Sequence, residues 1–229
     1  MTQRLPDNFS WHVLGVFAFF LLGVIIIVLQ SAADTPGLAQ LGAADLQGYY
    51  LHHVSTVMPF LAAAFLRLIF LNCGVALFIV CVPMFWVWIW WFRRDMLEPI
   101  VVIMKGTVLI LMMAMGHNSF PRLYLTYRTL PFDVFATLYY PHGVLEIFAF
   151  LAAGIFSLTC IDSLHAYLQD HGNDDLHPGD VGIFIFGRIW FGALCIMLLL
   201  VIAAFIESQV TPEMVEAALE HAMLQKMRG

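Results

Sequence analysis

The stretch Tyr140-Pro141-His142-Gly143-Val144-Leu145-Glu146 decides the fold, because it leads into the largely apolar run from Ile147 to Ile161. A proline suits the first turn of a helix, and residues four apart share one helix face. The stretch therefore predicts a membrane-spanning helix that opens at Pro141 and carries His142 and Glu146 on one face. Ionisable groups inside a span are costly and usually turn toward other helices or a wet cavity. His142 and Glu146 are thus the first functional candidates.

The composition of the chain is that of an integral membrane protein. Of its 229 residues, 62% are hydrophobic and 11% are charged, whereas ordinary soluble domains carry roughly 25% charged residues. The net charge is −6 and the Lys and Arg residues are scattered, which argues against a nucleic-acid partner. The four cysteines form no CxxC pair, so neither a zinc knuckle nor a disulfide framework is indicated. We expect one transmembrane helical domain over residues 1–212, surrounded by membrane lipid.

The apolar runs indicate about five transmembrane helices, each near the roughly 20 residues that cross the hydrocarbon core. These helices are expected at residues 11–30, 72–91, 99–116, 141–161 and 181–206. An apolar piece over residues 59–71 is expected to lie in the interface or to insert partly, with Arg67 and Asn72 marking its junction with the second span. Residues 117–140 are expected to hug the membrane or re-enter it, and residues 162–180 to form a solvated acidic loop. The predicted fold class is an all-α polytopic membrane protein with additional interfacial or re-entrant helices.

Charged residues predict the tail and the topology. A short amphipathic tail helix is expected over residues 213–229, because its acidic residues come early and its basic residues late, as the helix dipole prefers. A cytoplasmic N-terminus places Arg4, Arg93 and Arg94 inside, with Lys105 and Arg188 close to that side. The same topology leaves four basic residues outside, so the positive-inside count is nearly balanced. The four are Arg122, Arg128, Lys226 and Arg228. We adopt the topology with the N-terminus in the cytoplasm.

Three short stretches resemble the stage II sporulation protein M family. They are Leu71-Asn72-Cys73-Gly74-Val75-Ala76-Leu77 in an early span, His142-Gly143-Val144-Leu145-Glu146 at the start of a later one, and Glu207-Ser208-Gln209-Val210-Thr211-Pro212 after the last. Their order and spacing resemble the family over most of residues 58–212. The resemblance implies a multi-pass protein of the prokaryotic cytoplasmic membrane that works in assemblies and has no secure catalytic activity. The implied partners are other membrane-protein subunits, such as an ABC-type transporter or wall-remodelling proteins.

The candidate site is a polar face inside the membrane. It comprises His142, Gly143, Glu146, Glu207, Asn72 and Arg67. One reading is structural: Glu146 would pair with Arg67, Arg188 or Lys105, and such a pair would fix the register of the helices.

Two functional readings of the same face stay open. His142 and Glu146 are correctly spaced to share a zinc ion, with His117 or the pair His52-His53 as a third ligand. The stretch, however, has one histidine where the metalloprotease helix needs two. A proton or ion pathway through His142, Glu146 and Glu207 would instead fit a transporter.

These features favour a non-catalytic scaffold or permease-like subunit of a membrane complex, of an envelope-remodelling or export type. We expect a homo-oligomer or a larger complex, and no cofactor. The alternatives are an intramembrane metal-dependent hydrolase that uses His142 and Glu146, and a proton- or ion-coupled transporter subunit.

Overall fold

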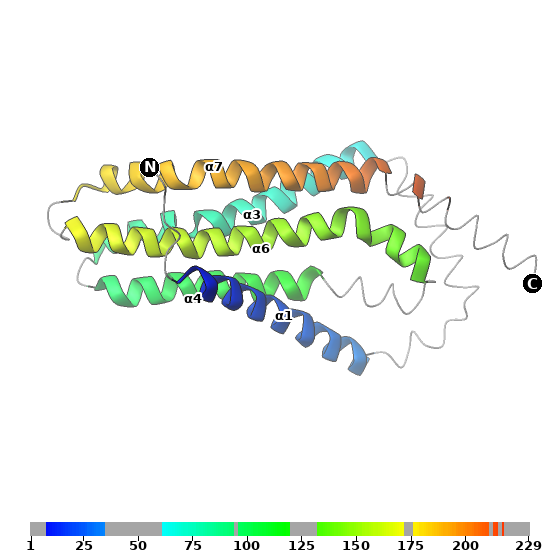
Figure 1. The fold of residues 1–229 in the computed structure, drawn as a ribbon, viewed down its shortest axis with the longest axis horizontal. Coiled ribbons are helices and arrows are strands. Elements are labelled where there is room, and N and C mark those ends of the chain that lie inside the picture. The colour runs from blue at the N-terminus through cyan, green and yellow to red at the C-terminus, as the bar shows by residue number, and fades with distance from the viewer. Residues whose placement is uncertain are drawn as a thin grey trace, which may run out of the picture.

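The protein is a bundle of long helices (Figure 1). The computed structural model describes residues 8–34, 61–93, 96–119, 132–171 and 176–210, together with residues 213, 214 and 217. Its elements are α1 (Phe9–Asp34), α3 (Leu61–Phe92), α4 (Leu97–Ser119), α6 (Phe132–His171) and α7 (Pro178–Phe205), followed by the π-helical turn η4 (Ile206–Val210). No strand occurs within these described ranges.

Each of the five described α-helices provides a stretch long and apolar enough to cross a membrane, and that of α7 continues through η4. These stretches are Phe9–Gln30, Ile69–Phe92, Leu97–His117, His142–His171 and Pro178–Val210. The prediction of an all-α polytopic membrane protein is therefore confirmed.

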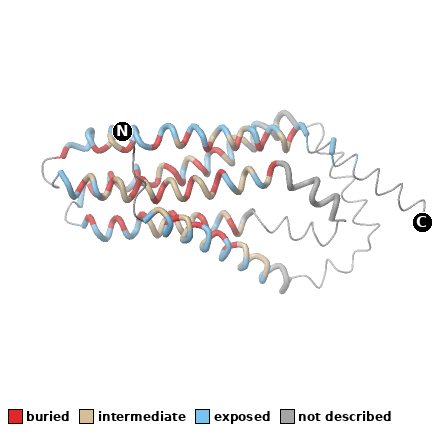
Figure 2. The backbone as a smooth tube through the Cα atoms, in the orientation of Figure 1, coloured by how far each residue is buried: buried red, intermediate tan, exposed pale blue. Residues whose placement is uncertain are grey.

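The helices are apolar on both their inner and outer faces. Buried and exposed residues alternate along every helix in Figure 2, and large apolar side chains occur in both classes. Trp90 is 1% exposed in the core of α3, whereas Trp88 on the same helix is 73% exposed. A helix that is hydrophobic all round suits a membrane, where the outer face meets lipid instead of water.

The five helices run in two opposite directions, and the packed pairs α1–α4 and α3–α6 are parallel. In Figure 1, α1, α4 and α7 run one way, and α3 and α6 run the other way. We call the end where α1, α4 and α7 begin the N-side end, and the opposite end the C-side end. The central helix is α6, which packs against α1, α3, α4, α7 and η4. The stretch that opens the sequence analysis therefore lies in the helix that contacts every other element.

The pair α1 and α4 is held in unusually close contact by two glycines. A Cβ atom added to Gly23 would lie 2.0 Å from the carbonyl oxygen of Met113, and one added to Gly116 would lie 2.1 Å from that of Phe20. The two backbones touch at this crossing, so only glycine fits there. Small residues permit such close approach of helices in membranes.

One predicted boundary in the first half of the chain is wrong. The break between the piece 59–71 and the span from Asn72 is absent, because α3 continues unbroken from Leu61 to Phe92. No glycine or proline lies at that junction, and Asn72 finds a partner within the bundle, as described below.

The central helix is also longer than predicted at both ends. It begins at Phe132, so Pro141 lies within a helix instead of opening one. It also continues to His171, so the predicted solvated loop is wrong for residues 162–171. The last helix begins at Pro178, three residues before the predicted Val181. Re-entry by residues 120–131 and most of the tail helix fall outside the described residues.

Candidate functional site

A polar contact joins α3 to α6 near the C-side end. The Asn72 side chain donates a hydrogen bond from Nδ2 to Oε1 of Glu146, over 2.5 Å. Both side chains are partly buried. The two residues lie 74 positions apart in the sequence, so the contact fixes the register of two non-adjacent helices.

His142 lies one turn before Glu146 on the same helix. Its side chain is 6% exposed, and Gly143 beside it is half-buried. The spacing of four residues places His142 and Glu146 on one face of α6, as the sequence predicts.

Glu207 reaches the same region from the end of α7. It lies in η4, which packs against both α3 and α6. Its carboxylate interacts electrostatically with that of Glu146, and the next residue, Ser208, is buried and donates a hydrogen bond to the carbonyl oxygen of Phe205 over 3.3 Å. A π-helical turn is rare and is often found at functional sites. We call Asn72, His142, Glu146 and Glu207 the polar junction.

The basic partners expected for Glu146 are engaged elsewhere. Lys105 forms an ion pair with Asp162. Arg188 donates a hydrogen bond to Oγ of Ser163 over 3.1 Å, and its guanidinium lies 5.0 Å from the centre of the Phe184 ring. The predicted pairs of Glu146 with Lys105 and Arg188 are therefore wrong, and the amide of Asn72 takes their place. The backbone of Arg67 lies in α3, but its side chain falls outside the described residues.

The metal reading lacks a full set of ligands in the described part of the chain. His117 contacts Gln30 instead, with 3.0 Å between Nε2 and Oε1. Within the ranges that the structure describes, no three His, Cys, Asp or Glu residues gather closely enough to hold a metal ion. His142 and Glu146 would supply two ligands at most, and the pair His52-His53 lies outside the described residues.

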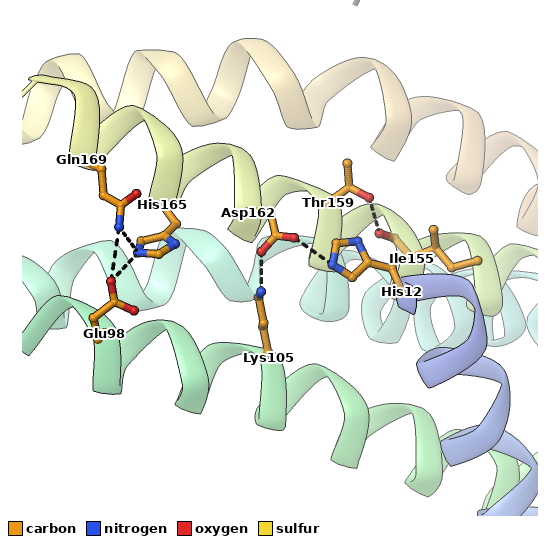
Figure 3. A network of polar contacts seen from close by, with 8 residues as sticks. All are labelled: His12, Glu98, Lys105, Ile155, Thr159, Asp162, His165 and Gln169. Atoms are coloured by element: carbon orange, nitrogen blue, oxygen red, sulfur yellow. Dashed lines mark hydrogen bonds and ion pairs between the residues drawn. The ribbon is translucent and has the colours of Figure 1, made fainter. Parts of the chain in front are cut away.

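A second polar cluster, which sequence reasoning missed, lies nearer the N-side end (Figure 3). Asp162 of α6 pairs through Oδ1 with Lys105 of α4 and through Oδ2 with Nε2 of His12 on α1, over 2.8 Å in the second case. The three side chains are 14%, 33% and 8% exposed, respectively. We call this set the charged triad.

Contacts between α4 and α6 continue from the triad to the end of the bundle. His165 Nε2 lies 2.9 Å from Oε1 of Glu98, and Gln169 donates a hydrogen bond to the same oxygen over 3.3 Å. Figure 3 shows these side chains bridging the two helices on the side of Asp162 away from His12. We call Glu98, His165 and Gln169 the polar seam. The signal in the sequence is the spacing of Asp162, His165 and Gln169 at i, i+3 and i+7, which places all three on one helix face.

The comparisons with known proteins identify the family. A family model described as "Stage II sporulation protein M" matches residues 16–212. The chain belongs to the stage II sporulation protein M family. No curated protein and no solved structure gave a match.

The polar junction unites the three stretches that carry the family resemblance. Asn72, Glu146 and Glu207 come from the first, second and third stretch, respectively, and all lie inside the matched residues. In this member of the stage II sporulation protein M family, stretches far apart in the sequence thus meet at one place in the bundle.

Proposed function

We propose that this protein is a non-catalytic subunit of a membrane complex, acting as a scaffold or permease-like component in envelope remodelling or export. The observation that carries the proposal is the polar junction. Its contact between Asn72 and Glu146 ties α3 to α6, and Glu207 brings the end of α7 to the same place. Polar contacts of this kind specify which helices pair inside a membrane, and in which register.

The outer surface supports a role in assembly. Large apolar side chains cover the exposed face of α7, and those of Phe186, Trp190, Phe191, Leu194 and Leu198 are each more than half exposed. Such a face can be covered by lipid or by helices of another subunit. The partner would then be a second membrane protein or a further copy of this chain, in the cytoplasmic membrane of a prokaryote.

A proton- or ion-coupled transporter subunit is the second candidate. The observation that favours it is the pair of carboxylates Glu146 and Glu207, which interact within the bundle while His142 lies buried one turn away. Intramembrane carboxylates that face other helices often act as proton relays. Few spans are available for a self-sufficient carrier, so this function too would need partner subunits.

Crosslinking within native membranes tests the proposal. The full chain would be crosslinked, purified in mild detergent, and analysed by mass spectrometry and for bound metal. We expect a stoichiometric membrane-protein partner or a homo-oligomer, and zinc far below one ion per chain. The contradicting result is a monomer that binds one zinc ion per chain, when His142→Ala loses the zinc and the exposed control His171→Ala keeps it. That result would favour the intramembrane hydrolase instead.

A further inference from the structure

The charged triad joins one helix end to the rest of the bundle. The elements that pack against α1 are α4 and α6. The charged and titratable groups that they bring to His12 are Lys105 and Asp162. From α7, Arg188 is held by Ser163, next to Asp162 in sequence, and by Phe184. Near the middle of α1, contact with α4 depends on Gly23 and Gly116, which carry no charge.

The two ring nitrogens of His12 have different surroundings. Nε2 of the imidazole faces Asp162, while Nδ1 is buried and has no hydrogen-bond partner in the described part of the protein. Neutral histidine can donate from Nε2 and leave Nδ1 as a bare acceptor, whereas protonated histidine carries a donor on both nitrogens. Protonation would therefore leave a buried N–H without an acceptor.

The charges of the triad also make protonation of His12 unfavourable. An ionised Asp162, a protonated Lys105 and a neutral His12 sum to zero. A proton on His12 would give the cluster a net charge of +1 in a largely buried place, and buried charge is unfavourable unless it is paired. The bundle could relieve this cost by moving His12, and with it α1, away from α4 and α6.

The polar seam lies between the triad and the surface at the N-side end. Glu98 is 67% exposed and His165 is 22% exposed, so the seam reaches the surface at the N-side end. His165 follows Asp162 by three positions on α6, which places their Cβ atoms about 5–6 Å apart. Glu98 precedes Lys105 by seven positions on α4, which is about 10 Å along the helix. Titratable groups thus follow one another from the surface to Asp162.

We propose that the charged triad is a proton-binding site, reached from the N-side end through the polar seam, whose charge state controls how firmly α1 is attached to α4 and α6. The site lies about 24 Å along α6 from Glu146, and the inference does not depend on the proposed function of the polar junction.

Nuclear magnetic resonance of the full chain in lipid nanodiscs tests proton binding. The protein would carry ¹⁵N-labelled histidine, with the His12 signal assigned by its loss in His12→Gln. We expect His12 to take up one proton as the pH is lowered, because imidazole is the side chain that gains a proton most readily near neutral pH. Its midpoint should move by about one pH unit or more in Asp162→Asn, because a charge within about 4–6 Å shifts titration by that amount. Lys105→Gln should also move the midpoint if Asp162→Asn does not fold, and His171→Gln should not.

Spin labels test the attachment of α1. Labels at the exposed positions Leu14 on α1 and Ile110 on α4 would be placed in a chain whose four cysteines are replaced by alanine. The distance distribution should broaden or lengthen over the pH range in which His12 titrates, and should stay constant in His12→Gln. The proposal is overturned if His12 does not titrate, if its midpoint is the same in the triad variants, or if the distance is unchanged as His12 gains its proton.

Discussion

At the scale of single residues, polar side chains inside the spans fix the contacts between helices. The sequence identified Asn72, Glu146 and Glu207 through three short stretches, and the structure brings them together. The partner of Glu146 could not be predicted, because helical spacing relates residues within one helix and says nothing about which side chain faces it from another. The expected partners were basic residues, whereas the partner in the structure is the Asn72 amide.

Replacing Glu146 tests the bond to Asn72. Glu146→Leu removes the acceptor and should lower the free energy of unfolding by about 0.6 kcal/mol, the average for polar contacts between membrane helices, and by at most about 1.7 kcal/mol. Glu146→Gln keeps an oxygen that can accept from Asn72, so its loss should be smaller. Reversible unfolding in nanodiscs would measure both, and a double-mutant cycle with Asn72→Leu would show little coupling if the bond does not contribute.

At the scale of helices, composition predicted the number of spans but not their lengths. Apolar runs of about 20 residues are visible in the sequence, and all five occur as helices. The extension of α6 through Asp162 was missed because acidic and histidine residues are typical of a solvated loop. In the structure, Asp162 and His165 instead face α4, where Asp162 pairs with Lys105 and His165 pairs with Glu98. The close crossing of α1 and α4 at Gly23 and Gly116 could not be predicted either, because an apolar run does not show which of its glycines contacts another backbone.

The helical state of residues 162–171 can be measured directly. Because these residues continue α6 and contact α4, their backbone amides should exchange with deuterium far more slowly than those of an open loop. Hydrogen-exchange mass spectrometry of the protein in nanodiscs would measure this. Rapid exchange of the amides from Asp162 onward would contradict the helix and support the solvated loop that the sequence predicts.

The glycine crossing predicts a sharp difference between positions on α4. Gly116→Ala places a Cβ atom against the backbone of Phe20, so it should separate α1 from α4 and destabilise the protein by about 1–3 kcal/mol, as overpacking does. Gly106→Ala is the matched control, because its Cβ would meet nothing within 4 Å. Thermal unfolding of both variants is the measurement, and equal stability would argue against the close crossing.

At the scale of the whole molecule, the bundle has two polar regions with different chemistry. The polar junction lies toward the C-side end, and the charged triad lies about 24 Å away along α6. Charge counting gave the topology only a slight preference, because basic residues occur on both sides. The helix directions in Figure 1 place the end of α3 and the start of α7 at the same end as the start of α1.

Labelling of single cysteines in cells would establish the orientation. Asp180 at the N-side end and Met214 beyond the C-side end are both exposed, so each can be replaced by cysteine in a cysteine-free chain. If the N-terminus is cytoplasmic, a membrane-impermeant thiol reagent should label Met214→Cys in intact spheroplasts, and Asp180→Cys only after permeabilisation. The opposite pattern would invert the topology.

The most direct test of the proposed function is complementation and co-purification with Glu146→Gln. Glutamine can keep the bond to Asn72 but cannot ionise, so it preserves a structural role and removes an acid, base or proton relay. If the polar junction is structural, the Gln variant should retain both its partners and its activity in cells, while Glu146→Leu loses both. An assembled Gln variant that fails to complement a deletion strain would contradict the account and make Glu146 a chemical participant.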